Sequence, residues 1–146
     1  AVAAAVARAT GRRRALATQP ATGVTCPVAD GETMGRLAPG EPEPWLVLPD
    51  EGNHVSPRHA RFEHTARGWA IEDTSLNGTY VGTSEGWTHL LSEEGHARRG
   101  DTDGTPPPPK VLVPEDAVVA PVHPEYGIEL RLSPLEGDAD ASDPRR

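Results

Sequence analysis

The chain has 146 residues, 36% of them hydrophobic, and a formal net charge of −8. This length accommodates one domain with a hydrophobic core, and the acidic balance argues against a general nucleic-acid binder. The single cysteine, Cys26, excludes an internal disulfide, and no apolar run has the ~20 residues that a membrane span needs. We therefore expect neither a disulfide-stapled nor a membrane-embedded protein.

The first 14 residues are Ala-rich and end in a run of Arg. An Ala-rich run favours helix, but the order of apolar and then basic residues is the reverse of a secretory signal. We expect residues 1–14 to form a flexible N-terminal segment, with a short helix packed on the domain as the alternative.

Short segments with strand-like alternation begin at Ala15. Val24, Cys26 and Val28 recur at every second position, which is the period of a strand with one buried face. Further strand patterns occur at residues 33–34, 45–48, 60–63, 69–73, 80–81, 111–113, 118–119 and 128–132. Cys26, Trp45 and Trp69 fall inside these patterns, so we expect all three in the core.

Two stretches break this rhythm. Residues 82–109 contain many Gly, Ser, Glu and Arg and end in four consecutive prolines, which predicts a long insertion loop. Residues 135–146 are acidic and rich in Gly, Ala and Asp, which predicts a disordered C-terminal tail. The short strands, the Gly and Pro turns and the lack of a long helical pattern favour an all-β sandwich of two sheets.

Three short motifs stand in a fixed order along the chain. They are Gly35-Arg36, Ser56-x-x-His59 and Asn77-Gly78-Thr79. This order, with strand patterns between the motifs, resembles the forkhead-associated (FHA) domain across residues 15–134. The resemblance implies a β-sandwich whose binding loops gather at one end, and a module that binds phosphothreonine rather than an enzyme.

The resemblance also implies a role for each matching residue. Arg36 and Ser56 would contact the phosphate, which suits an Arg fork and a hydroxyl donor, and Asn77 would hold the peptide main chain. His59 would brace the loop that carries Ser56. Arg58 is a further candidate for the phosphate.

Four more residues are expected to support this site. Gly35 precedes the phosphate-binding Arg, and Ser75 stands close to Asn77. Gly78 permits the positive φ of a turn, and Thr79 is a turn and core position.

Three positions depart from the family pattern. Pro57 offers no side-chain or backbone donor after Ser56, Leu76 replaces a hydroxyl residue before Asn77, and Gly82 replaces a second Asn. Losing two such contacts would weaken phosphopeptide binding about tenfold or more. The alternative function is therefore a degenerate FHA fold that acts as a phospho-independent interaction or structural module.

Other site chemistries have weaker support. Ser56, His59 and Asp73 include the residue types of a hydrolytic triad, but no nucleophile elbow accompanies them. His54, His59 and His64 are five residues apart with Pro57 between them, a poor spacing for zinc. We expect no catalysis, metal or other cofactor. The expected partner is a phosphothreonine-containing protein or peptide, such as a Ser/Thr kinase or its substrate, in the cytoplasm of a bacterium, with no nucleic acid or membrane involved.

Overall fold

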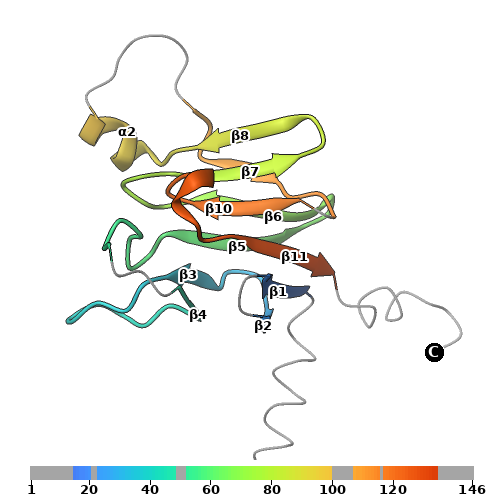
Figure 1. Cartoon of the computed structure of the whole chain (residues 1–146), viewed down its shortest axis with the longest axis horizontal. Helices are drawn as coiled ribbons and strands as arrows, with labels where there is room; N and C mark the ends of the chain where they lie inside the picture. Colours follow the sequence, from blue (N-terminus) through green and yellow to red (C-terminus); the bar gives the residue numbers. More distant parts are fainter. Residues whose placement is uncertain (1–14, 21–22, 49–51, 100–106, 116, 135–146) are drawn as a thin grey trace, which may run out of the picture.

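The computed structural model describes residues 15–20, 23–48, 52–99, 107–115 and 117–134 (Figure 1). The expected flexible segment 1–14 and the expected tail 135–146 lie outside the described residues. The elements are β1 (Ala15–Gln19), β2 (Val24–Val28), β3 (Thr33–Gly35), β4 (Leu46–Val47), β5 (Ala60–Thr65), β6 (Gly68–Asp73), β7 (Thr79–Thr83), β8 (Gly86–Leu90), α2 (Glu93–Arg99), β9 (Lys110–Leu112), β10 (Val118–Pro121), the 3-10 helix η1 (Pro124–Tyr126) and β11 (Leu130–Pro134).

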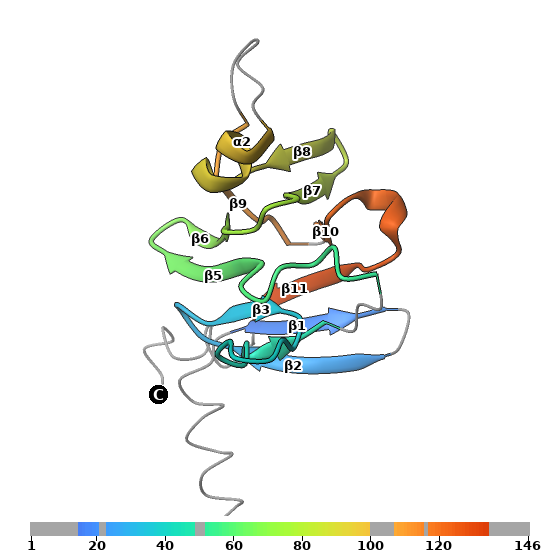
Figure 2. The same ribbon diagram turned by 90° about the vertical axis from the view of Figure 1, so that its left-hand side faces the viewer.

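The strands form two sheets. One sheet has the order β2-β1-β11-β10-β7-β8, and the other has the order β4-β3-β5-β6-β9. β3 and β4 pair in parallel, whereas β5 pairs antiparallel with both β3 and β6. The expected all-β sandwich is confirmed. In Figure 2, α2 and the β3–β4 segment lie at opposite ends of the view, with β5 and β6 between them.

Side chains from both sheets fill the core between them. Phe62 on β5 and Ile71 on β6 face each other in register and are almost fully buried. Val81 and Leu130 come from the other sheet and belong to the same buried cluster. Burying a side chain such as Phe62 stabilises the fold by about 1.5–3 kcal/mol, so these pairs fix the strands that carry the loops.

Trp69 is in the core, as expected, but Trp45 is not. Trp45 is 43% exposed, and its indole N–H donates to the carbonyl of Pro27 at 2.7 Å. The expectation failed because only two residues of the apolar run 45–48, Leu46 and Val47, form the strand β4. Trp45 lies just before this strand and need not face the core. Cys26 is half-buried at the margin of the core.

The expected insertion loop at residues 82–109 was wrong for most of its length. Residues 86–90 form β8, which pairs with β7, and α2 and β9 follow. Gly82 lies opposite Trp87, and a Cβ at Gly82 would come 2.8 Å from the Trp87 ring. The bare backbone of Gly82 thus accommodates the indole, a cross-strand pairing that apolar periodicity does not reveal. Residues 100–106 lie outside the described residues.

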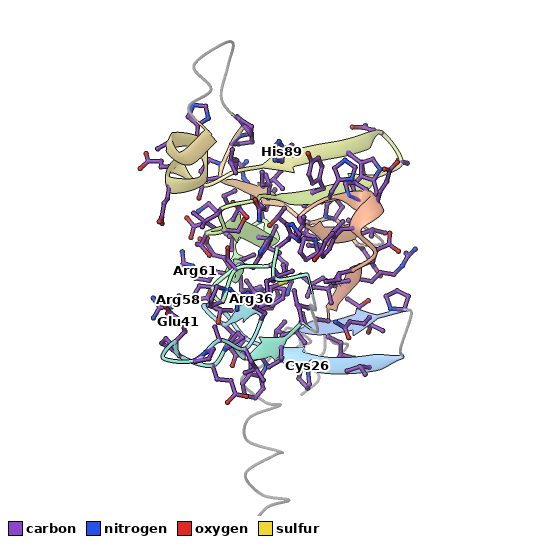
Figure 3. The ribbon with its side chains drawn as sticks, turned by 60° about the vertical axis from the view of Figure 1, so that its left-hand side comes forward. Cys26, Arg36, Glu41, Arg58, Arg61 and His89 are labelled. Carbon is purple, nitrogen blue, oxygen red and sulfur yellow. The ribbon has the colours of Figure 1, made fainter. Side chains whose placement is uncertain are left out.

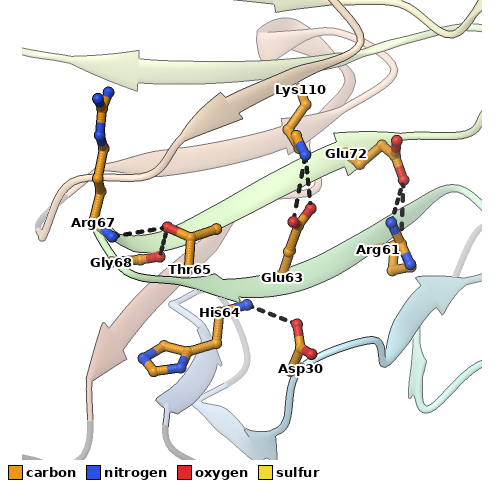
Figure 4. Close-up of polar contacts among 9 residues, drawn as sticks. All are labelled: Asp30, Arg61, Glu63, His64, Thr65, Arg67, Gly68, Glu72 and Lys110. Carbon is orange, nitrogen blue, oxygen red and sulfur yellow. Dashed lines mark hydrogen bonds and ion pairs between the residues drawn. The ribbon is translucent and has the colours of Figure 1, made fainter.

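The outward face of β5, β6 and β9 is lined with exposed ion pairs (Figure 4). Arg61 binds Glu72 of the neighbouring strand at 2.8 Å, and Lys110 binds Glu63 at 3.1 Å. Within the described residues, no helix combines the length and apolar character of a membrane span.

Candidate functional site

Three loops meet at one end of the sandwich. They are the described part of the β4–β5 loop (residues 52–59), the β6–β7 loop (74–78) and the β10–β11 loop (122–129). The Gly78 carbonyl accepts the Val122 N–H at 2.9 Å, which joins the second loop to the third. Val122 holds a positive φ of 73°, and such a conformation is strained for a β-branched residue. The strain shows that the surrounding contacts impose this loop geometry.

His59 joins the first two loops from a fully buried position. Its Nδ1 accepts the Ser56 N–H at 3.0 Å, and its Nε2 lies 2.7 Å from the Gly78 carbonyl oxygen. The carbonyl can only accept, so Nε2 carries the proton and the ring is a neutral imidazole. This geometry agrees with the bracing role expected for His59.

Gly35 lets the β4–β5 loop approach β3 closely. A Cβ on Gly35 would lie 2.1 Å from the Pro57 carbonyl oxygen and 2.7 Å from that of Ser56. In addition, the Arg36 N–H donates to the Ser56 carbonyl at 3.2 Å. Glycine before Arg36 is therefore a packing requirement that sets the separation of Arg36 and Ser56.

The β6–β7 loop is tied down by the buried carboxylate of Asp73. Its Oδ1 accepts the hydroxyls of Ser75 at 2.6 Å and Thr79 at 2.7 Å, and its Oδ2 accepts the Ser92 N–H at 2.8 Å. Ser75 Oγ also accepts the Gly78 N–H at 2.7 Å. Ser75 and Thr79 thus hold the turn that contains Asn77.

Burial raises the pKa of Asp73 above its ordinary value of 3.8. The hydrogen bonds from Ser75, Thr79 and Ser92 favour the charged carboxylate and oppose this shift. Desolvation is the larger effect because the side chain is almost fully buried in the sandwich.

Gly78 is the residue about which the loop turns. Its φ is +93°, and a Cβ there would lie 2.6 Å from Nε2 of His89 and 3.0 Å from the Leu90 carbonyl oxygen. Both the backbone conformation and the space around Gly78 therefore require glycine.

The helix α2 packs against the same loop. Ser92 caps it, because Ser92 Oγ accepts the Gly95 N–H at 2.9 Å and donates to the Ser75 carbonyl at 2.7 Å. A Cβ on Gly95 would come 2.8 Å from the Ser75 carbonyl oxygen and 3.2 Å from that of Leu76. Glycine in the helix thus permits α2 to lie directly on the loop.

An open groove of about 670 Å³ runs along this end of the molecule. The β4–β5 loop contributes Ser56, Pro57 and Arg58 to its lining, and the β6–β7 loop contributes Thr74 and Leu76. The Ser56 hydroxyl accepts the Leu76 N–H at 3.2 Å, so its own proton is left to donate. The structure therefore brings the predicted Ser56 and Arg58 together on one surface.

Arg36 lies on the same side of the molecule as Arg58 but does not line the groove (Figure 3). Its side chain is half-buried, and its Nε is buried without a hydrogen-bond partner. Burying a donor without a partner costs about 1–3 kcal/mol. This unsatisfied donor sets Arg36 apart from a cation engaged in a surface ion pair.

Asn77 also lies beside the groove rather than in its lining. Its side-chain amide donates to the His54 carbonyl at 2.8 Å, which links the β6–β7 loop to the β4–β5 loop. His54 in turn contacts Tyr126 of η1 through its Nδ1 and the phenolic oxygen, 3.2 Å apart. Asn77 thus lies where the three loops meet.

The residues of the possible hydrolytic triad do not form one. Both ring nitrogens of His59 bind backbone groups, and the Asp73 carboxylate binds Ser75, Thr79 and Ser92. His59 therefore does not present a base to the Ser56 hydroxyl. Among the described residues, no group of three His, Cys, Asp or Glu side chains is arranged to hold a metal ion.

Sequence reasoning missed several residues that shape this end. Glu41, Arg61 and Glu94 line the groove, and Ser92 anchors α2. The helix did carry a signal, because Ser92 followed by Glu93 and Glu94 is an N-cap with acidic residues in the first turn. No pattern in the sequence placed Glu41 of the β3–β4 loop (36–45) in the same groove lining as Glu94 of that helix.

Comparisons with known proteins agree with this geometry. The family model of the FHA domain matches residues 33–93, which include all three motifs. No curated protein sequence matches the chain.

Solved FHA domains share the fold. An FHA domain solved in a study of phosphothreonine-dependent FHA interactions is 18% identical, with 82% of this chain and 95% of that chain covered and a TM-score of 0.53. The FHA domain of FhaA, in complex with the intracellular domain of Rv3910, is 18% identical, with 81% and 98% covered and a TM-score of 0.51. The FHA domain of an Arabidopsis thaliana hypothetical protein is 17% identical, with 84% and 86% covered and a TM-score of 0.52. Residues 33–93 of this chain therefore match the forkhead-associated domain family, and the chain shares the fold of solved FHA domains.

Proposed function

We propose that this protein is a phosphothreonine-peptide reader. The observation that carries the proposal is the groove in which the Ser56 hydroxyl and the exposed Arg58 lie together, on a loop braced by buried His59. A phosphate brings about −1.5 to −2 charges and three acceptor oxygens, and a hydroxyl with an Arg fork satisfies such a group. The domain solved in the study of phosphothreonine-dependent interactions has the same fold, which supports the assignment.

Arg36 completes the site when ligand binds. Its Nε has no partner in the unliganded protein, so reorientation toward a phosphate would relieve an unsatisfied donor as well as form an ion pair. Asn77 holds the peptide main chain from the junction of the three loops, and His59 keeps Ser56 in place. The setting we propose is Ser/Thr kinase signalling in the bacterial cytoplasm, with a kinase or its substrate as partner.

A titration of phosphothreonine peptides tests this function. Wild type should bind a phosphothreonine peptide library better than its unphosphorylated form, and Arg36→Ala should lose about 1.5–3 kcal/mol of binding free energy, or roughly tenfold or more in affinity. Arg67→Ala is the matched control, because Arg67 is an exposed Arg on the β5–β6 turn and lies outside this groove. Equal binding of both peptide forms would refute the proposal.

The second candidate is a phospho-independent interaction module. It is favoured by Pro57 and Leu76 in the groove lining, since neither side chain offers a polar contact, and by the Asn77 amide already donating to His54. A phospho-independent module should keep its partner proteins bound after phosphatase treatment, and the Arg36→Ala variant should bind the same partners. Capture that disappears with phosphatase would exclude it.

A further inference from the structure

The groove contains carboxylates as well as cations. Glu41 comes from the β3–β4 loop and Glu94 from the first turn of α2, while Ser56 and Arg58 lie in the same lining. In Figure 3, Arg61, Arg58 and Glu41 follow one another down one edge of the molecule, below α2. Figure 2 shows α2 and the β3–β4 segment at opposite ends of the view, and each of these two elements contributes one carboxylate to the groove lining.

The two carboxylates have no cation of their own. Both side chains are exposed, and neither makes an ion pair with another described residue. Arg61, which also lines the groove, donates to a single oxygen of Glu72, Oε1, from its Nε at 3.2 Å and from a terminal nitrogen at 2.8 Å. Arg58 is therefore the unpaired cation among the described residues of the lining, which also holds two unpaired carboxylates.

This charge arrangement is unfavourable for an acidic phosphopeptide. A dianionic phosphate beside Ser56 and Arg58 would be repelled by both carboxylates and by the net charge of −8. A basic side chain on the peptide would reverse that repulsion and pair with a carboxylate. Pro57 and Leu76 also line the groove but have no polar side-chain groups, so charge selection falls to the charged residues of the lining.

We propose that Glu41 and Glu94 make this site selective for phosphothreonine peptides with an Arg or Lys near the phosphothreonine. The inference rests on the proposed function and adds a substrate class to it. The structure thereby assigns Glu41 and Glu94 as specificity residues and not as general supports of the fold.

The test uses one phosphothreonine peptide scaffold with a single Arg placed in turn at each position flanking the phosphothreonine, and Gln at the others. Affinities are measured for the full chain and for Glu41→Gln, Glu94→Gln and the double variant. Glu43→Gln and Glu93→Gln are matched controls, because each lies near its counterpart in the same loop or helical turn, is exposed and is outside the groove lining.

Wild type should prefer the best Arg peptide over the all-Gln peptide by about two- to fivefold, as expected for a solvent-exposed ion pair. Glu41→Gln or Glu94→Gln should reduce that preference, and the double variant should abolish it, while both controls keep it. Phosphopeptide binding without an Arg preference, or a preference unchanged in the double variant, would overturn this inference and leave the proposed function standing. No phosphopeptide binding at all would overturn both.

Discussion

The loop end and the outward face of β5, β6 and β9 both contain many polar side chains, but these are organised in different ways. At the loop end, His59 and Asp73 are buried, and their partners are backbone groups and short hydroxyl side chains. On the outward face, Lys110 and Glu63 pair at 3.1 Å while remaining 45% and 26% exposed. Buried hydrogen bonds fix a loop because leaving a buried partner unsatisfied is costly, whereas exposed ion pairs are screened by water and salt. The loop end is thus rigidly built, and the outward face is a solvated surface.

Replacing His59 should have the largest effect. His59→Ala leaves the half-buried Ser56 N–H without its acceptor, takes one of two donors from the Gly78 carbonyl, and opens a cavity. We expect a loss of about 3 kcal/mol in the free energy of unfolding, together with loss of phosphopeptide binding. Chemical denaturation measures the stability. His64→Ala, which replaces a half-buried His on β5, is the control and should cost clearly less.

The carboxylate of Asp73 comes next. Asp73→Asn keeps an oxygen for Ser75 and Thr79 but turns an amide donor toward the Ser92 N–H, so we expect a loss of about 2 kcal/mol. Asp30→Asn is the control, since its amide oxygen can still accept the His64 N–H. If the two variants unfold at the same denaturant concentration, Asp73 does not hold the loop.

The pH dependence of the stability should show a smaller effect than these substitutions. Its direction follows from the raised pKa of Asp73. Because burial raises the pKa of Asp73, the folded protein retains this proton to higher pH than the unfolded chain. The stability from this group is fully present below the ordinary pKa of 3.8 and is lost as pH rises through the folded value. The stability advantage of wild type over Asp73→Asn should therefore shrink from acidic to neutral pH. Denaturation curves of both proteins across that pH range measure the difference in their free energies of unfolding. A stability advantage of wild type that grows with pH would contradict a raised pKa of Asp73.

The exposed ion pairs should matter least. Lys110→Gln removes the pair with Glu63 at the surface, and we expect a change of about 0.5 kcal/mol or less, reduced further by salt. Thermal denaturation at low and high ionic strength measures the change. A loss comparable with that of His59→Ala would remove the contrast between the two regions.

The strands were largely predictable from sequence, whereas the way the loops meet was not. Alternation identified β5 and β6 because Phe62 and Ile71 bury one face of their strands. It failed at β8, where Trp87 and its neighbours are exposed and the strand is held by pairing with β7. It also misplaced Trp45, because an apolar residue beside a two-residue strand need not face the core.

The motifs named the candidate site residues, but only the structure shows what each one touches. The requirement for Gly35 comes from the Pro57 carbonyl, which lies 22 positions later in the chain. The tie between Asp73 and Ser92 likewise joins two separate segments. Contacts of this kind depend on strand order and register, which local periodicity does not encode.

The most direct test of a phosphothreonine site at the loop end is an NMR titration of the labelled protein with a phosphothreonine peptide. We predict amide shifts at Arg36, Ser56, Arg58 and Asn77, with Glu63 and Lys110 on the outward face unmoved. Addition of the unphosphorylated peptide should leave all of these signals in place. Shifts confined to the outward face, or the same shifts with both peptides, would contradict the claim that the braced loop end is a phosphothreonine site.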